Sequence, residues 1–145
     1  MVEVLIARLP HAEGLPLPSL ATPGSAGYDL ASAETATLQP MERKLIRTGL
    51  QIALPPGYEC QLRPRSGLAL RDGITLPNTP ATIDSDYRGE LMVALVNLGD
   101  RPFEVTRGMR IAQMVVAPVV RVRFQPVEGL PVSERGRGGF GSTGC

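Results

Sequence analysis

Charged side chains crowd one short stretch of the sequence, just ahead of an apolar run. The segment IDSDYRGE, residues 83–90, contains three carboxylates and one arginine. A carboxylate can act as a general base by taking a proton from water, and the only histidine, His11, lies in a proline-rich stretch. In strand alternation Asp84 and Asp86 share one face and Tyr87 the other. We therefore expect acid–base chemistry to fall to a carboxylate here, unless the segment is only a solvated turn.

A second candidate is an anion site in PRSGLAL, residues 64–70. Ser66 follows Arg65 and can act as the N-cap of a short helix that ends before Gly73. The free N–H groups and the dipole at a helix N-terminus favour negative charge. We expect phosphate to bind at Ser66 and Gly67, the alternative being that Ser66 only caps the helix.

Two polar side chains interrupt otherwise apolar runs. Asp29 stands in AGYDLAS, residues 26–32, and Gln113 stands in RGMRIAQMVV, residues 107–116. Buried polar groups need hydrogen-bond partners. Each of these residues therefore either faces a ligand or bonds to the backbone.

The segment RGRGGFGSTG, residues 135–144, places five glycines around two arginines, one phenylalanine and a Ser-Thr pair. Its letters match G-x-G-x-x-G and part of a P-loop, but these motifs need a strand before them and a helix after them. The P-loop lysine is also missing. Alone, the segment is typical of a frayed terminus, unless the rest of the chain gives it a partner.

The elements that must position these residues are short β-strands. Glycine and proline are frequent, with 16 and 14 residues, and turn sequences separate the apolar runs. Short β-branched runs at this spacing are typical of β-sandwiches and barrels. We predict one all-β domain with a single short helix within SGLALRDG, and an arm or tail at residues 125–145. The apolar runs are residues 2–7, 43–54, 91–97 and 109–124.

Charge and cysteine content argue against several classes of protein. The formal net charge of +1 suggests no basic surface for nucleic acid or membranes. No run approaches the roughly 18 apolar residues of a membrane span, and the N-terminus lacks the basic region of a signal peptide. Cys60 and Cys145 are too few for a disulfide framework or a zinc site. We expect a cytoplasmic protein with free thiols and no direct contact with nucleic acid or membrane.

Five segments in order resemble the five motifs of the trimeric dUTPases: AGYDL, PRSGLAL with the later Gly-Ile, IDSDYRGE, RGMRIAQM and RGRGGFGSTG. The resemblance covers residues 26–144. It implies a jelly-roll-like dUTPase β-barrel in residues 1–134 and a flexible C-terminal lid in residues 135–145 of the same domain. It also implies a homotrimer with shared active sites and Mg²⁺-dependent hydrolysis of dUTP to dUMP and pyrophosphate, by attack of water on the α-phosphorus. Such an activity keeps uracil out of DNA and supplies dUMP for dTMP synthesis.

The resemblance assigns a role to each polar residue described above. Asp84 matches the carboxylate that orients and deprotonates the attacking water. Asp29 matches an acid that reaches Mg²⁺ through water, which suits a metal that takes its direct ligands largely from substrate phosphates. Phosphate contacts are implied for Arg65, Ser66, Gly67 and Gln113.

The same resemblance places uracil recognition in a hairpin at residues 74–84. Asn78 and the backbone from Thr82 through Ile83 to Asp84 are implied to face the edge of the base. A tight hairpin leaves no room for the methyl group of thymine. Unmatched donors and acceptors disfavour cytosine, because buried polar groups left unpaired are costly.

Tyr87 matches the tyrosine under the deoxyribose, where its ring would clash with a 2′-hydroxyl, and Met92 lies nearby by the same match. Three positions depart from the family pattern. Ala81 stands where glycine is expected, so a requirement for φ > 0 would alter the hairpin. Arg71 replaces a lysine and Arg137 adds a charge to the tail, and both can tune phosphate affinity.

The tail is implied to close over the substrate as a lid, which excludes water. Phe140 would stack on the uracil, while the polar residues of the tail reach the terminal phosphates. The substrate-binding residues implied here are Arg135, Phe140, Gly141, Ser142 and Thr143.

Two alternatives remain open within the same fold. A dCTP deaminase or bifunctional deaminase needs a proton-shuttling glutamate beside the base, where this chain has IDSDY. A trimer that binds nucleotides without catalysis needs no general base. Release of pyrophosphate from dUTP separates the enzyme from the non-catalytic binder.

Overall fold

A computed structural model describes residues 1–144. The prediction of a free thiol at Cys145 lies outside this range. The described chain folds into β-strands with one α-helix and one short 3-10 helix, η1, Pro10–Ala12. The strands are β1 (Leu5–Arg8), β2 (Ser19–Leu20), β3 (Tyr28–Ala31), β4 (Ala36–Leu38), β5 (Arg43–Arg47), β6 (Leu50–Ala53), β7 (Tyr58–Arg63), β8 (Ile74–Thr75), β9 (Ala81–Ile83), β10 (Met92–Asn97), β11 (Phe103–Val105) and β12 (Arg110–Pro118).

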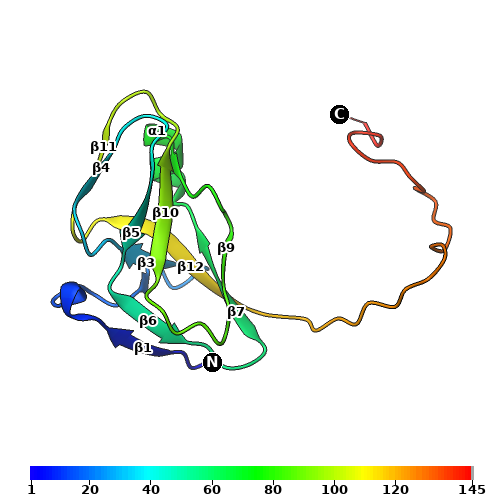
Figure 1. Ribbon diagram of the computed structural model, residues 1–145, viewed down its shortest axis with the longest axis horizontal. Helices are drawn as coiled ribbons and strands as arrows, with labels where there is room; N and C mark the ends of the chain where they lie inside the picture. The colour runs from blue at the N-terminus through cyan, green and yellow to red at the C-terminus, as the bar shows by residue number, and fades with distance from the viewer. Residues whose placement is uncertain (145) are drawn as a thin grey trace.

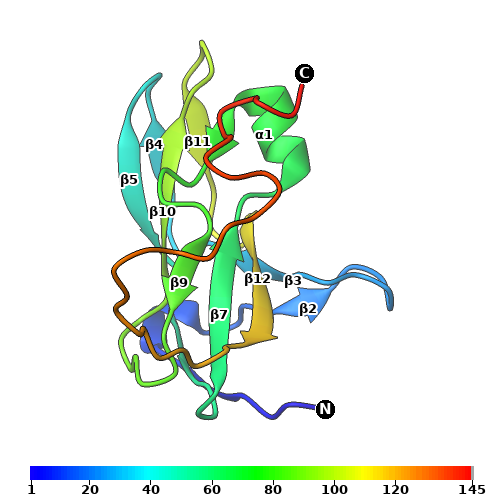
Figure 2. The same ribbon diagram turned by 90° about the vertical axis from the view of Figure 1, so that its right-hand side faces the viewer.

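All strand pairs are antiparallel and form four sheets. The largest has the order β2-β3-β12-β7-β9, and a second has the order β5-β10-β8. The other two sheets are the two-stranded pairs β1-β6 and β11-β4. The strands surround one core, with α1 at the end of the molecule opposite the N-terminus (Figures 1 and 2). The all-β, jelly-roll-like prediction is confirmed, although the sheets do not close into one continuous barrel.

Alternation in β10 shows why these residues form strands around a core. Val93, Leu95 and Asn97 point inward and are fully buried, while the residues between them are half-buried. Buried Asn97 is satisfied: its amide donates to the carbonyls of Leu38 at 3.0 Å and Arg101 at 2.7 Å. A buried amide with all its partners helps fix strand register.

Cys60 lies in β7 and is a free thiol, as the sequence predicts, and its side chain is fully buried. Burial, with a smaller effect of the Glu59 charge, raises the pKa of Cys60 to about 12. The thiolate is therefore disfavoured and the side chain packs as a small apolar group.

The one α-helix within residues 1–144, α1, spans Ser66–Asp72, close to the prediction, but its first turn differs. Arg65, with an extended backbone, is the N-cap, and Ser66 is already helical. The prediction of Ser66 as N-cap is therefore wrong. At the other end Gly73 has φ 70°, and an added Cβ would lie 2.6 Å from the backbone nitrogen of Gly99. Both the left-handed conformation and the close backbone approach require glycine there.

The acidic segment after β9 is a turn and not a strand. β9 ends at Ile83, and the N–H of Tyr87 donates to the carbonyl of Asp84 at 3.2 Å. Strand alternation of Asp84 and Asp86 is thus wrong, because the chain reverses between them and β10. The two strands within residues 74–84 pair with different partners, β8 with β10 and β9 with β7. The predicted hairpin is therefore a connection between two sheets.

Ala81 fits this connection without a glycine. It lies in β9 opposite Leu62, with a side chain only 8% exposed. Within the described residues, the non-glycine positions with positive φ are Met41 and Phe140, so Ala81 needs no left-handed conformation. The expected distortion of the hairpin at Ala81 does not occur.

Residues 119–144 form no strand and leave the body of the molecule as an extended tail (Figure 1). β12 ends at Pro118, although the apolar run continues to residue 124. The N–H of Val119 still donates to the carbonyl of Gly57 at 2.8 Å. Beyond this bond no strand of the same chain accompanies the segment, so its apolar side chains stay exposed.

Candidate active site

The carboxylate of Asp29 lies between two arginines from different elements. Its side chain is 16% exposed; Oδ1 lies 3.6 Å from Nε of Arg65, and Oδ2 accepts a hydrogen bond from Nη1 of Arg110 at 3.1 Å. Arg65 also donates to the carbonyl of Arg110 at 3.3 Å. Asp29 therefore orients two guanidinium groups beside the start of α1. Two such groups form a suitable site for a polyanion.

Gln113 joins the same group of residues. It pairs with Asp29 across β3 and β12, and its Nε2 donates to the carbonyl of Pro64 at 3.0 Å. An added Cβ on Gly27 would lie 2.1 Å from Oε1 of Gln113, so only glycine leaves room for this side chain. The amide thus bonds to backbone and holds β12 against the turn before α1.

The start of α1 is open on its outer side. A Cβ on Gly67 would meet no atom within 4 Å, so a ligand can approach the backbone there. Arg65 precedes this point and Ser66 begins the helix. The structure thus brings the predicted phosphate residues together in one region with Asp29. Within residues 1–144, no group of three or more His, Cys, Asp or Glu side chains could hold a metal ion.

A second group of predicted residues lines a cavity of about 250 Å³. Its lining includes Thr82 and Ile83, whose backbone is expected to face the uracil. It also includes Asp84, the expected general base, and Tyr87. Glu90, the last residue of IDSDYRGE, also lines it, as does Leu45, which the sequence did not single out. The lining residues are Leu45, Thr82, Ile83, Asp84, Tyr87, Glu90 and Met92.

Tyr87 is held in this cavity by the segment that follows it. Its hydroxyl donates to the carbonyl of Glu90 at 2.8 Å. An added Cβ on Gly89 would lie 2.4 Å from the same hydroxyl oxygen, so the phenol packs directly on the backbone. The position of Tyr87 therefore depends on the backbone at residues 89 and 90.

The carboxylate of Glu90 is almost enclosed, with 12% of its side chain exposed. Burial raises the pKa of Glu90, but hydrogen bonds from His11 and Gly49 and the charges of His11 and Arg47 outweigh this effect and lower the pKa. The ionised form is favoured. No local sequence pattern indicates these contacts, because His11 and Glu90 are separated by 79 positions.

The remaining predicted residues lie elsewhere. Asn78 is absent from the cavity lining. Phe140 is fully exposed, with φ 52°, and the tail folds back on itself around a hollow of about 670 Å³. The hollow is lined by Ser133, Glu134, Arg135, Gly138, Ser142 and Thr143. In one chain the tail and the body of the molecule stand apart (Figure 1).

Comparison with known proteins decides the family. The dUTPase family model matches residues 13–144. A deoxyuridine 5'-triphosphate nucleotidohydrolase from Zymomonas mobilis subsp. mobilis is 53% identical over 99% of this chain and 98% of its own length. A protein of the same name from Methylocella silvestris is 54% identical over 97% of this chain and 90% of its own length.

The chain belongs to the dUTPase family.

The fold agrees with that of a solved dUTPase. The Staphylococcus bacteriophage 80alpha dUTPase, determined with dUpNHpp, superposes with a TM-score of 0.90 at 27% identity, covering 99% of both chains. The resemblance inferred from the five motifs is thereby confirmed.

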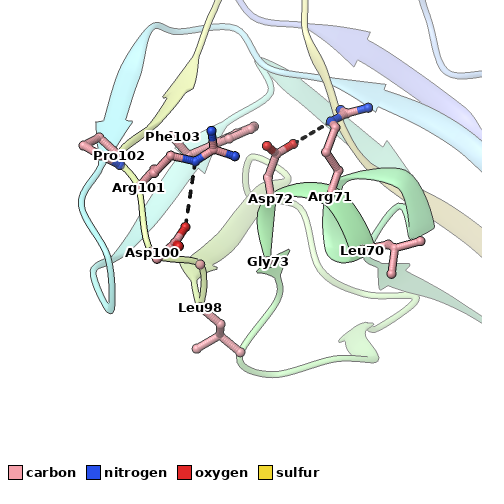
Figure 3. Close-up of a pocket in the computed structure, with 10 residues that line it drawn as sticks. Leu70, Arg71, Asp72, Gly73, Leu98, Asp100, Arg101, Pro102 and Phe103 are labelled. Carbon is pink, nitrogen blue, oxygen red and sulfur yellow. Dashed lines mark hydrogen bonds and ion pairs between the residues drawn. The ribbon is translucent and has the colours of Figure 1, made fainter.

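A further hollow, of about 630 Å³, lies at the C-terminal end of α1, where Leu70, Arg71 and Gly73 of the second motif line it (Figure 3). Its charged side chains are paired with neighbours: Arg71 Nε lies 3.1 Å from Asp72, and Arg101 Nε lies 3.8 Å from Asp100. None of the residues implied to contact phosphate, metal or uracil lines this hollow, so we assign it no role in the site.

Proposed function

We propose that this chain hydrolyses dUTP to dUMP and pyrophosphate in a Mg²⁺-dependent reaction, and so keeps uracil out of DNA and supplies dUMP for dTMP synthesis. The observation that carries the proposal is the cavity that gathers Asp84 with Thr82, Ile83 and Tyr87. The names and high identity of the relatives support dUTP as the substrate. We also place the activity in the cytoplasm. No helix within residues 1–144 is long and apolar enough to cross a membrane.

Asp84 is the general base in this proposal. Its side chain is exposed at the rim of the cavity and, within residues 1–144, takes part in no ion pair or hydrogen bond that would occupy its oxygens. A free carboxylate can orient water and take its proton as the water attacks the α-phosphorus. The bond from the α-phosphorus to the bridging oxygen breaks, and pyrophosphate leaves with that oxygen.

The phosphates are held beside α1. Arg65 and Gln113 are fixed by Asp29 and by Pro64, and Gly67 leaves its backbone accessible. Ser66 supplies a hydroxyl at the first helical position. Guanidinium and backbone N–H groups form charge-assisted hydrogen bonds to phosphate oxygens.

Asp29 suits a metal held mainly by the substrate. A single carboxylate, already facing two arginines, provides no cage, which fits a water-mediated contact to Mg²⁺ bound by phosphate oxygens. Bound Mg²⁺ would neutralise charge on the phosphates during transfer. Asp29 itself aligns Arg65 and Arg110 with the same phosphates.

Uracil and deoxyribose would occupy the cavity. The backbone of Thr82 and Ile83 offers donors and acceptors at one wall, and Asn78 lies in the connection that leads to this wall. Tyr87 would lie under the sugar with Met92 nearby. A fixed aromatic ring there excludes a 2′-hydroxyl by shape.

We propose a homotrimer whose active sites combine residues from different subunits. The Asp29 region, the Asp84 cavity and the tail form three separate groups in one chain, which supports sharing between copies. Tail residues Arg135, Phe140, Gly141, Ser142 and Thr143 would close over base and phosphates as a lid. Phe140 is fully exposed and free to stack on a base.

The test is release of pyrophosphate from dUTP by Asp84→Asn. This change keeps the size of the side chain but removes the base, so turnover should fall by about 10²- to 10⁴-fold while dUTP binding is largely kept. Asp86→Asn is the matched control, because Asp86 is exposed and does not line the cavity. Near-parental turnover of Asp84→Asn would remove Asp84 from the role of base. A parent protein that binds dUTP without releasing pyrophosphate would be the non-catalytic trimer.

A further inference from the structure

Three side chains from distant parts of the sequence form a small cluster beside the cavity, the Glu90 cluster, made of His11, Arg47 and Glu90. Oε2 of Glu90 lies 2.7 Å from Nε2 of His11 and accepts the N–H of Gly49 at 2.9 Å. Oε1 lies 3.5 Å from Nε of Arg47. All three donors converge on one nearly buried carboxylate. The side chain of Glu90 is thus fixed from both of its oxygens.

The ring of His11 is fixed as well. Nη2 of Arg47 lies 3.2 Å from Nδ1 of His11. A guanidinium group can only donate hydrogen bonds, so Nδ1 accepts and Nε2 carries the hydrogen that Glu90 accepts. Both ring nitrogens are occupied, and the cluster selects one tautomer of the histidine.

The segment that carries His11 is docked independently of Glu90. The N–H of Leu9 donates to the carbonyl of Gly49 at 2.7 Å. An added Cβ on Gly49 would lie 2.3 Å from Cβ of Ala12, so η1 packs directly on the turn that contains Gly49, between β5 and β6. The same turn gives Glu90 its backbone hydrogen bond. η1 and the loop before β10 are therefore joined at one point.

The cluster reaches Tyr87 through the backbone of Glu90. The carbonyl that accepts the Tyr87 hydroxyl belongs to the residue whose side chain is fixed by His11 and Arg47. Gly89, between them, lets the phenol rest on this backbone. Any displacement of Glu90 would therefore move the support of the phenol.

We propose that Glu90 is a positioning residue for Tyr87 and that His11 and Arg47, by fixing Glu90, set how strictly the cavity excludes a ribose 2′-hydroxyl. The inference rests on the proposed function, in which Tyr87 lies under the deoxyribose. Shape exclusion depends on the place of the ring, because an apolar pocket alone rejects an added hydroxyl poorly. A residue of the N-terminal segment thereby contributes to choice of sugar.

The readout is the ratio of kcat/KM for dUTP to kcat/KM for UTP. Glu90→Ala and His11→Ala should each lower this ratio, Glu90→Ala by about tenfold, the scale of one lost charge-assisted hydrogen bond. His11→Gln keeps a donor near the position of Nε2 and should restore much of the ratio. Glu104→Gln, a carboxylate on β11 that accepts a hydrogen bond from Thr37 on the surface, is the control and should leave the ratio unchanged.

One result would overturn the positioning role: an unchanged ratio in both His11→Ala and Glu90→Ala. This includes an equal loss of activity on both nucleotides, which a purely structural cluster would give. His11 is partly exposed, so His11→Ala provides the decisive result if Glu90→Ala does not fold.

Tyr87→Ala separates this inference from the function on which it rests. A lowered ratio in Tyr87→Ala, with parental ratios in both cluster variants, overturns only the positioning role. An unchanged ratio in Tyr87→Ala overturns the sugar contact of Tyr87 and the positioning role together. Pyrophosphate release from dUTP by the parent protein still tests the hydrolase activity in that case.

Discussion

Asp29 and Asp84 are both aspartates in dUTPase motifs, yet their surroundings divide the chemistry between them. Both oxygens of Asp29 face arginines, so in the proposed function this residue would orient positive charge toward the phosphates. Asp84 lies at the rim of a cavity with its oxygens open to solvent. A general base needs a free lone pair aimed at water. The contacts therefore favour Asp84 as the base and Asp29 as an organiser of phosphate ligands.

Glu90 gives the protein an acid-side dependence of stability. Its pKa in the folded state lies below the ordinary value of 4.5, since His11, Gly49 and Arg47 outweigh the effect of burial. On acidification, Glu90 therefore takes up its proton at a lower pH in the folded state than in the unfolded state. This contribution to the free energy of unfolding is complete above pH 4.5 and is lost as pH falls through the lower folded pKa.

Urea unfolding of the parent and of Glu90→Gln, at neutral pH and at a series of values below 4.5, checks this dependence. The parent should be more stable at neutral pH, and the difference between the two proteins should shrink on acidification. The charged and titratable groups that face Glu90 are Arg47 on β5 and His11 on η1. A constant difference across the series would show that ionisation of Glu90 does not stabilise the fold.

At the scale of elements, close approach between β3 and β12 makes a single glycine important for the site. Gly27→Ala would place a methyl group against the end of the flexible Gln113 side chain, which must move away from Pro64. We expect kcat/KM for dUTP to fall by about tenfold or more, because small misplacements of binding groups are costly. The melting temperature should change little. Gly24→Ala, where an added Cβ meets nothing within 4 Å, is the control.

Equal activity of the two glycine variants would show that the position of Gln113 does not matter for turnover. A large drop in melting temperature for Gly27→Ala would instead place the strain in the backbone just before β3. Circular dichroism melts and steady-state kinetics on the same samples distinguish these results.

The sequence predicts elements well where local chemistry decides them. The alternation of buried and half-buried side chains fits β10, and Gly73 marks the end of α1. Both features depend on residues close together in the sequence. The sequence leaves a turn after Ile83 open as an alternative to strand alternation, and the bond from the N–H of Tyr87 to the carbonyl of Asp84 shows that the turn forms. The contact of His11 with Glu90 depends on the packing of η1 against Gly49, which no local pattern records.

The whole molecule has apolar surface that a single chain leaves uncovered. The exposed apolar side chains of the tail include Val120, Val122, Phe124, Leu130 and Val132. Large exposed apolar patches are unusual on monomers and mark interaction sites. Together with the separation of the three site regions, they favour assembly with further copies of the chain, so light scattering should give a mass near that of three chains.

Deletion of residues 135–145 tests the lid at the same scale. Trimer mass and melting temperature should be nearly unchanged, because the described part of this segment buries no core side chain. In contrast, kcat/KM for dUTP should fall by at least about 100-fold, since closure excludes water and adds contacts to base and phosphates. Phe140→Ala should cost roughly 5- to 150-fold, the range of base–aromatic stacking. Undiminished kcat/KM after deletion would show that the segment is only a frayed terminus and not a lid.

The length of the extended segment 119–144 also sets the local concentration of the tail near a site. If this length of chain behaves as a flexible coil, its root-mean-square span is roughly 30 Å. Short flexible tethers give effective concentrations on the order of millimolar. If the tail acts as the proposed lid, it would remain at this local concentration however dilute the protein becomes, whereas the same peptide supplied separately at micromolar concentration would occupy the site about a thousand times less often.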